Sequence, residues 1–307
     1  MTVLQLEDVT KTFGDRRVVD RLTFDLREGT IFGLLGPNGS GKTTTIRMIL
    51  RILEPDEGTI RVFGERLNEA TKHRVGYLPE ERGLYKNMKV LDHLRFLGKL
   101  RGLDANEART RSLAWLERFD AGSWAGRKVE ELSKGMQQKV QFISTLLNDP
   151  DLIILDEPFA GLDPVAAQLL KEVMLDLRRK GRTIIFSTHQ MEQVERSCDA
   201  IVLIHNGRAV LSGPVSDVRA RFGTPSVKVE FDGELGDLSA VEGVRSVENK
   251  GRYAEITLAD FSRSAHLLRH LVERVNVRRF EISEASLEEI FISQVKGDGR
   301  VVAEVGT

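Results

Sequence analysis

The sequence has little cysteine and no long apolar run. Among its 307 residues Cys198 is the single cysteine, which excludes an intramolecular disulfide framework and a cysteine-rich zinc site and fits a reducing cytosol. Its neighbours SCDAIVLI are apolar, so we expect a small buried side chain. No stretch approaches the roughly 18 apolar residues of a membrane-spanning helix, and the opening MTVLQLEDVT predicts no signal peptide. If the protein works at a membrane, we expect another chain to span it.

An excess of either charge is also lacking. Lys and Arg number 45 and Asp and Glu 46, for a formal net charge of -1. General nucleic-acid binders usually carry a basic excess, so we expect no nucleic-acid partner. With 41% hydrophobic residues and this length, the chain can form one large domain and a smaller one.

Apolar periodicity predicts an α/β fold for the larger part. Strands are expected in residues 3–35, 59–64, 152–155, 183–187 and 200–204, and helices in 46–53, across 87–131 and in 165–177. Buried apolar strands that alternate with helices favour a parallel sheet with helices on both faces.

The pattern restarts after the stretch FGTPS, a predicted linker at 222–226. Alternating apolar residues in 227–231 and 254–258 predict strands, and Leu268, Leu271, Val272 and Val275 have helical spacing. We predict a small α+β domain of ferredoxin-like type over 227–296. The tail 297–307 has few apolar anchors and is expected to be mobile.

The segment GPNGSGKT, Gly36–Thr43, fits the pattern G-x-x-x-x-G-K-[ST] between a predicted strand and a predicted helix. Backbone N–H groups of Gly39, Gly41, Lys42 and Thr43 can point at phosphate oxygens near the helix N-terminus. Lys42 would bridge the β- and γ-phosphates of a nucleotide, and Thr43 would hold Mg²⁺. The alternative is a mere glycine-rich turn.

The second element is a pair of acidic residues that follows the buried strand in LIILDEP, residues 152–158. Asp156 can bind the water shell of Mg²⁺, and Glu157 can polarise a water molecule for in-line attack on the γ-phosphate. Downstream of a phosphate loop, this pair predicts nucleotide hydrolysis.

A third element, ELSKGMQQK at 131–139, resembles the LSGGQ signature of ABC-transporter ATPases. Phe13 in KTFG is similar to the aromatic residue that stacks on adenine in that family. The segment GLDP, with Asp163, looks like the D-loop of that family. The segment STH, with His189, looks like the segment that carries its switch histidine. The resemblance covers residues 2–220, with all motifs in order. It implies a P-loop ABC-type ATPase domain over 1–221, with an antiparallel β subdomain and a helical subdomain at about 84–131.

The resemblance also implies the site. The expected ATP-binding residues are Phe13, Val18, Asn38, Gly39, Ser40, Gly41, Lys42, Thr43 and Thr44. Two domains would pair head to tail around two ATPs, and each ATP would be closed by Ser133, Lys134, Gly135 and Met136 of the other domain. Glu157 and His189 would be catalytic, and Thr43, Glu80 and Asp156 would bind the metal. The alternatives are a core aromatic for Phe13 and a capping or core histidine for His189.

Two positions depart from the family pattern. Lys134 stands where the signature has a glycine, and Met136 where it has a glutamine. The serine and the second glycine, which would contact the γ-phosphate, are retained. Lys134 adds a cation near that interface, and we expect it to tune closure.

The stretch VGYLPEERGLY, residues 75–85, falls where the family has its Q-loop. The usual glutamine is replaced by Glu80, which keeps a ligating oxygen for Mg²⁺ but loses the amide donors. Glu81 is expected to face solvent or the junction with the helical subdomain. For Glu80 the alternative is a solvated turn.

GYLPEERGLY, LSKGMQQKVQFI and SLEEIFI together resemble the ATPases of ABC-2-type exporters, the group that includes Nat-type sodium-extrusion systems. This resemblance implies ABC-2-type membrane permease partners, a second ATPase subunit (another copy or a related chain), and a peripheral place on the cytoplasmic face of the cell membrane. The surface around Tyr85–Val90 is expected to meet the permease.

Two other functions compete. One is a soluble ABC ATPase that acts on nucleic acid or ribosomes. Three features argue against it: the single ATPase domain, the absence of a long insertion between Lys42 and Asp156, and the neutral charge. The other is a regulatory sensor built around residues 227–296.

Overall fold

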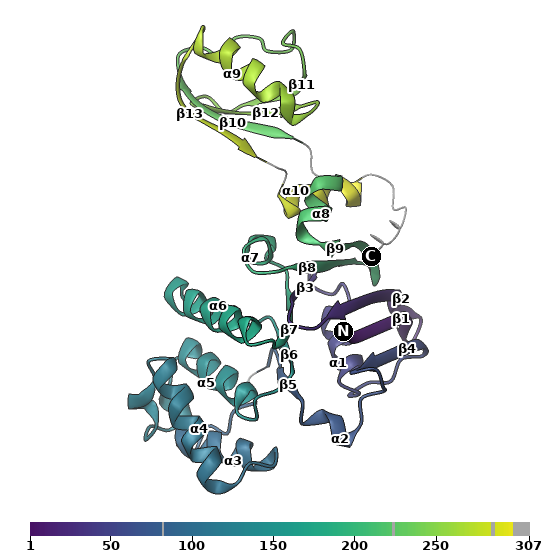
Figure 1. Ribbon diagram of the computed structural model, residues 1–307, viewed down its shortest axis with the longest axis vertical. Coiled ribbons are helices and arrows are strands. Elements are labelled where there is room, and N and C mark those ends of the chain that lie inside the picture. The colour runs from purple at the N-terminus through teal and green to yellow at the C-terminus, as the bar shows by residue number, and fades with distance from the viewer. Residues whose placement is uncertain (82, 223–224, 284–285, 297–307) are drawn as a thin grey trace. The chain divides into compact units, whose positions relative to one another are not determined.

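A computed structural model describes residues 1–81, 83–222, 225–283 and 286–296 (Figure 1). The expected tail 297–307, part of the expected linker 222–226, and Arg82 of the VGYLPEERGLY stretch lie outside these residues. The chain forms two compact units, which divide between Pro214 and Val215. This division lies ahead of the linker expected at 222–226. No helix in the described ranges is long and apolar enough to cross a membrane.

The first unit contains a six-stranded sheet in the order β5-β6-β7-β3-β8-β9. All neighbouring strands are parallel except the β8–β9 pair. The strands are β3 (Ile31–Leu35), β5 (Val75–Leu78), β6 (Leu152–Asp156), β7 (Thr183–Thr188), β8 (Ala200–His205) and β9 (Arg208–Pro214). β3, β6 and β7 are buried along their whole length, which is why they appear in the sequence as uninterrupted apolar runs.

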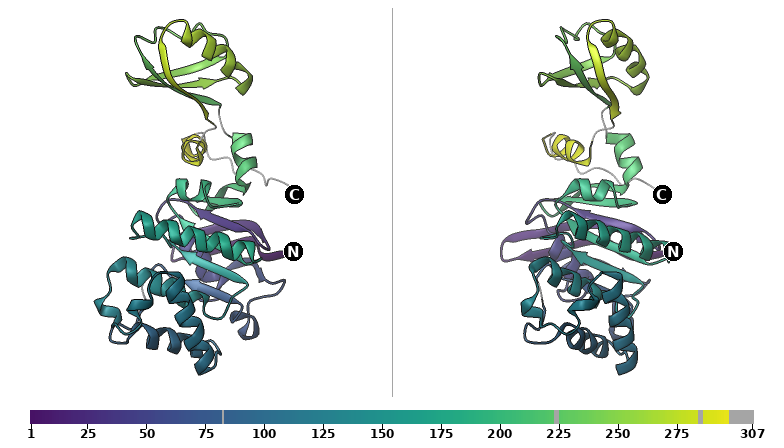
Figure 2. Two further views of the ribbon diagram at one scale, coloured as in Figure 1. Left: turned by 60° about the vertical axis from the view of Figure 1, so that its left-hand side comes forward. Right: turned by 90° about the vertical axis from the view of Figure 1, so that its left-hand side faces the viewer.

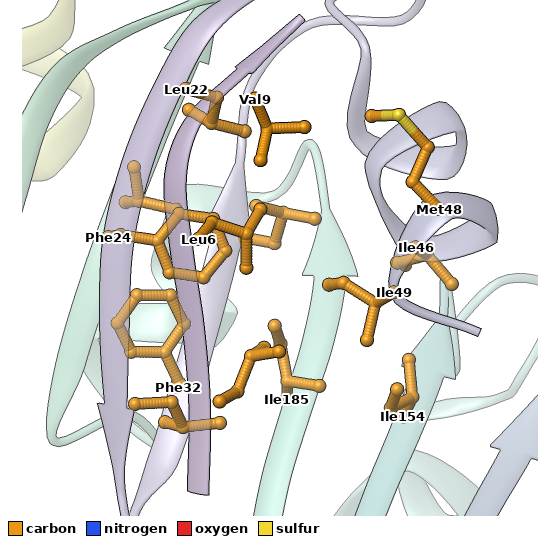
Figure 3. Packing of buried hydrophobic residues seen from close by; sticks show 14 of the residues in the cluster. Leu6, Val9, Leu22, Phe24, Phe32, Ile46, Met48, Ile49, Ile154 and Ile185 are labelled. Carbon is orange, nitrogen blue, oxygen red and sulfur yellow. The ribbon is translucent and has the colours of Figure 1, made fainter. Parts of the chain in front are cut away.

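A three-stranded antiparallel sheet, β2-β1-β4, lies beside the central sheet. It consists of β1 (Thr2–Phe13), β2 (Arg16–Arg27) and β4 (Glu57–Val62). Its inward side chains pack with α1 (Lys42–Ile49) and with the central sheet in one core, which Figure 3 shows. The rings of Phe24 and Phe32 stack between the two sheets, with centroids 5.3 Å apart. This core fixes α1, and with it the loop that precedes it, against the ends of the central strands.

The remaining helices of the first unit are α2 (Glu69–Lys72), α3 (Val90–Leu100), α4 (Ala105–Arg118), α5 (Lys134–Leu146), α6 (Pro164–Arg179) and α7 (Met191–Glu195). α5 contacts β5, α6 contacts β7 and α1 contacts β6. Figure 1 places α5 and α6 on one side of the central sheet and α1 on the other. The predicted α/β fold with an antiparallel β subdomain and a helical subdomain is therefore confirmed.

α1 begins and ends four residues earlier than the predicted helix 46–53. The sequence pattern extended the helix to Leu53, but it ends at Ile49 and Arg51 has a positive φ of 53°. The amides of Ile52 and Leu53 both donate to the carbonyl of Arg47, so the chain turns back on the helix end. Leu53 still packs against the core from this turn, which explains why its spacing looked helical.

The second unit has α8 (Val215–Phe222), an antiparallel sheet in the order β11-β12-β10-β13, and two further helices. The strands are β10 (Ser226–Asp232), β11 (Val244–Asn249), β12 (Tyr253–Leu258) and β13 (Asn276–Ser283), and the helices α9 (Ser264–Val272) and α10 (Leu287–Lys296). α9 covers one face of the sheet (Figure 2). The strand order suits a ferredoxin-like sheet, but residues 233–243, where that fold has its first helix, are irregular. Leu235, Leu238 and Val241 from this segment fill the core instead.

Candidate nucleotide site

The loop Gly36–Gly41 joins β3 to α1, and two of its glycines are needed where they stand. Gly36 has φ 150°, and a Cβ added there would lie 2.2 Å from the carbonyl oxygen of Ile204. Gly41 has φ 112°, and a Cβ there would lie 2.8 Å from the carbonyl oxygen of Val18. Gly41 is also the N-cap of α1 and supplies no side-chain acceptor to the first-turn amides. Those amides can therefore bind an anion.

Lys42 is directed into this loop. It is only 6% exposed, and its Nζ donates to the carbonyl oxygens of Gly36 at 2.8 Å and Pro37 at 3.2 Å. Burial is the main cause that lowers the pKa of Lys42, while the carboxylates of Glu157, Asp156 and Glu80 act in the opposite direction. The ammonium group thus lies where phosphate oxygens on the first-turn amides of α1 would meet it.

Asp156 ends β6 and is fully buried. Its Oδ1 accepts a hydrogen bond of 2.5 Å from the hydroxyl of Ser187, and its Oδ2 has no hydrogen-bond partner among the described residues. A buried carboxylate oxygen without a partner is costly unless a cation satisfies it. In the described ranges no three His, Cys, Asp or Glu side chains form a metal cluster. Asp156 alone could serve a cation such as Mg²⁺, which takes one or two carboxylates, waters and phosphate oxygens.

Glu157 follows in a left-handed conformation, with φ 48°. Its amide donates to the hydroxyl of Ser187 at 3.0 Å and to the carbonyl of Ser187 at 3.2 Å. Its Oε1 lies 3.0 Å from Nδ1 of His189 and 3.9 Å from Nζ of Lys42. The strained turn at Glu157 thus aims a mostly buried carboxylate between a lysine and a half-exposed histidine.

Ser187 is a site residue that the sequence analysis missed. It lies opposite Asp156 in the β6–β7 register and contacts both Asp156 and Glu157. Its position two residues before His189, at the end of a buried strand, was the available signal. A serine there has no motif of its own, because its role depends on strand pairing.

Phe13 and Val18 lie on the β1–β2 hairpin. Phe13 is 48% exposed, and Nζ of Lys11 lies 5.6 Å from the centroid of its ring, so Phe13 is not a core aromatic. Val18 is partly buried and packs against the core beside the phosphate loop. Of the other expected ATP-binding residues, Asn38 and Gly39 are exposed, Ser40 and Gly41 are buried, and Thr43 and Thr44 are partly buried.

Glu80 is exposed, yet it is close enough to Lys42 to act on the pKa of that lysine. The backbone around it is tied to the helical part of the unit. Gln141 on α5 donates through Nε2 to the carbonyl oxygens of Pro79 at 3.1 Å and Glu81 at 3.2 Å. Gln141 is a second residue missed from sequence, and it links the Glu80 loop to the helix that carries Ser133.

The signature residues lie at the N-terminal end of α5. Ser133 is the N-cap of α5, accepts from the amide of Met136 at 3.3 Å, and is exposed together with Lys134. A Cβ built on Gly135 would lie 3.6 Å from the carbonyl oxygen of Gly161, so this helix start neighbours the GLDP loop. Asp163 in that loop caps α6 by accepting from the amide of Ala166 at 2.8 Å. The structure therefore brings together Lys42, Asp156, Glu157 and His189, but places Ser133–Met136 on a separate helix.

Comparison with known proteins shows which family the chain resembles. Residues 19–160 match the ABC transporter family, and residues 213–295 match the C-terminal domain of ATP-binding proteins like DrrA1-3. The uncharacterized ABC transporter ATP-binding protein YhaQ of Bacillus subtilis is 44% identical, over 95% of this chain and 98% of that protein. The Nod factor export ATP-binding protein I of Paraburkholderia xenovorans is 41% identical, over 69% of this chain and 71% of that protein.

A solved structure described as an ATP-binding subunit of an ABC transporter has 36% sequence identity and a TM-score of 0.67. The match covers 72% of this chain and 93% of that one. The sequence relatives and the structural match thus indicate the same family. The chain belongs to the ABC transporter ATP-binding proteins, the ATP-hydrolysing subunits of these transporters.

Proposed function

We propose that this chain powers an exporter by pairing head to tail with a second ATPase subunit around two ATPs. One observation carries the proposal. Lys42, Asp156, Glu157 and His189 converge on one site, whereas Ser133 and Lys134 are exposed at the start of α5. Ser133 would therefore complete the site of a partner subunit. Export is supported by the Nod factor export relative and by the match to a DrrA-like C-terminal domain.

In the proposed mechanism, the first-turn amides of α1 and Lys42 bind the phosphates. Asp156 Oδ2 and the Thr43 hydroxyl would hold Mg²⁺, which neutralises phosphate charge when bound. Glu157 accepts a proton from the attacking water, while His189 positions the Glu157 carboxylate through Nδ1. The partner's Ser133 hydroxyl and Gly135 amide would close on the γ-phosphate side.

A trans-complementation assay tests this pairing. Purified Lys42→Ala and Ser133→Arg chains are assayed for ATP hydrolysis separately and as an equal mixture. A mixed dimer has one site with both residues intact, so the mixture should recover about a quarter of wild-type activity while each variant alone stays inactive. The matched control is the Lys42→Ala/Ser133→Arg double variant mixed with Lys42→Ala, which should stay inactive. A mixture no more active than its components would contradict the head-to-tail arrangement.

We further propose that the permease docks on the helical part of the first unit, with the whole assembly at the cytoplasmic face of the membrane. Tyr85, Phe96 and Leu100 are 53%, 38% and 66% exposed. The rings of Tyr85 and Phe96 meet edge to face with centroids 5.5 Å apart. An exposed apolar patch of this kind suits a helix of a partner subunit.

Cysteine cross-linking tests the docking surface. Because Cys198 is the single cysteine, a Cys198→Ser background gives a clean starting point. Phe96→Cys in that background should cross-link to a co-expressed membrane subunit, and the control Asp25→Cys, at an exposed position of β2, should not. Cross-links from Asp25→Cys alone would place the interface elsewhere.

A further inference from the structure

The turn between β8 and β9 touches both halves of the proposed ATP site. Its residues Asn206 and Gly207 have positive φ values of 49° and 80°. The amide of Gly207 donates to the carbonyl of Ser40 in the phosphate loop at 3.0 Å. The carbonyl of Gly207 accepts from the amide of Asp20 on β2 at 2.9 Å. The turn therefore joins the phosphate loop to the strand that carries Val18.

The backbones at this junction pack too closely to admit a side chain. A Cβ on Gly207 would lie 2.6 Å from the carbonyl oxygen of Val18, and one on Gly41 would lie 2.8 Å from the same oxygen and 3.8 Å from Cα of Gly207. The phosphate loop, β2 and the turn thus meet backbone to backbone. A shift of the turn must move β2, the loop or both.

A buried carboxylate holds this turn in place. Asp20 is 6% exposed, and its Oδ2 accepts a 2.5 Å hydrogen bond from Nε of Arg208, the residue directly after Gly207. Its Oδ1 accepts from Arg17 at 2.9 Å, and Nε of Arg21 lies 3.7 Å away. Burial alone would raise the pKa of Asp20, but the hydrogen bonds from Arg208 and Arg17 outweigh it and lower the pKa. The pair therefore stays ionised at neutral pH.

We propose that Asp20 and Arg208 are positioning residues that set the spacing between the adenine-facing hairpin and the phosphate loop. The inference rests on the proposed ATP site, in which Phe13 and Val18 face the base and Gly39–Thr43 hold the phosphates. Asp20 acts through Gly207, since its carboxylate fixes Arg208 and its amide fixes the turn itself. A ligand that spans both subsites depends on this spacing, whereas a ligand confined to the phosphate loop does not.

The test compares ATP with inorganic tripolyphosphate as ligands, both with Mg²⁺, by isothermal titration calorimetry on the full chain. Asp20→Asn should weaken ATP binding about tenfold, the typical effect of losing a charged hydrogen bond. Tripolyphosphate should stay within about twofold of wild type, because it lacks a base. Arg208→Gln should show the same selective loss, and the double variant should lose little more than either single variant. The matched control is Asp25→Asn, an exposed carboxylate on the same strand.

Three outcomes separate this inference from the proposed function. Equal weakening of ATP and tripolyphosphate, in variants whose circular dichroism matches wild type, would mean a general disruption of the loop and overturn the inference. Unchanged binding of both ligands would overturn it as well. Failure of the wild-type chain to bind ATP would instead overturn the proposed function. If Asp20→Asn does not fold, Arg208→Gln, which leaves Asp20 paired with Arg17, decides the question on the same criteria.

Discussion

At the scale of single residues, the consecutive acids Asp156 and Glu157 have different surroundings. Asp156 is buried and accepts a hydrogen bond from the hydroxyl of Ser187, whereas Glu157 turns back in a left-handed conformation toward Lys42 and His189. The sequence could predict which of these side chains gather, because strand ends of a parallel sheet meet at one edge. It could not predict Ser187 or Gln141, because their contacts depend on strand register and helix packing.

Glu80 is the clearest residue-scale departure from the family pattern. Glu80→Gln should retain ATPase activity with an altered Mg²⁺ dependence, because either side chain offers an oxygen to the metal side of the site. Glu80→Ala removes that oxygen and should lower turnover roughly ten- to a hundredfold. Steady-state hydrolysis measured across a Mg²⁺ titration checks both variants. Equal activity in wild type and both variants would mean that Glu80 is only part of a solvated turn.

At the scale of elements, α9 shows how the predicted apolar face of a helix can be displaced. The sequence assigned Leu268, Leu271, Val272 and Val275 to one apolar face. In the structure Leu271 and Val275 are buried as predicted, although Val275 lies beyond the end of α9. Val272, the last residue of the helix, is 56% exposed, and Leu267 is buried. The several leucines and valines of this segment fit two helical phases almost equally well, and packing against the sheet selects one.

α3 carries a buried histidine that makes the helical part sensitive to acid. His93 is 0% exposed, its ring lies 5.8 Å from that of Tyr85, and neither ring nitrogen has a hydrogen-bond partner among the described residues. Burial lowers the pKa of His93 to about 4. Between this value and the unfolded value of about 6.5 the unfolded chain binds more protons, so stability rises with pH. The contribution is complete above about pH 6.5 and is lost as the pH falls toward about 4.

His93→Leu should therefore flatten the pH dependence of unfolding. Between about pH 7 and about pH 5, wild type should lose about 2 kcal/mol of unfolding free energy that the variant keeps. Urea unfolding followed by tryptophan fluorescence measures this, since both tryptophans, Trp115 and Trp124, lie in the helical part. The control His73→Gln changes an exposed histidine, and its unfolding free energy should depend on pH as that of wild type does. An identical slope in wild type and His93→Leu would contradict the account.

At the scale of the whole molecule, the sequence predicted two parts, and the structure has two compact units. The division before Val215 reflects helix pairing: α8 and α10 contact each other, with Val215, Val218, Leu287 and Ile290 all buried. These helices are far apart in sequence, so no local signal marks α8 as part of the second unit. The irregular segment 233–243 also carries no local signal, because its apolar residues reach the core without forming a helix or strand.

A chain that ends at Pro214 should fold and keep the ATP site. The main core and the residues Lys42, Asp156, Glu157 and His189 all belong to the first unit. ATP affinity and basal hydrolysis should stay within about threefold of the full chain, measured by calorimetry and a phosphate-release assay. A rise in basal hydrolysis well beyond that range would support a regulatory role for the second unit. Loss of ATP binding in a folded truncation would contradict the assignment of the site to residues 1–214.

Whether Glu157 is the base that activates water is tested most directly by comparing wild type with Glu157→Gln in ATP binding and in single-turnover hydrolysis. Gln keeps the shape of the side chain but cannot accept the proton of the attacking water. We expect Glu157→Gln to bind ATP with an affinity within about threefold of wild type and to hydrolyse it at least about a hundredfold more slowly. Hydrolysis by Glu157→Gln at the wild-type rate would contradict that role of Glu157.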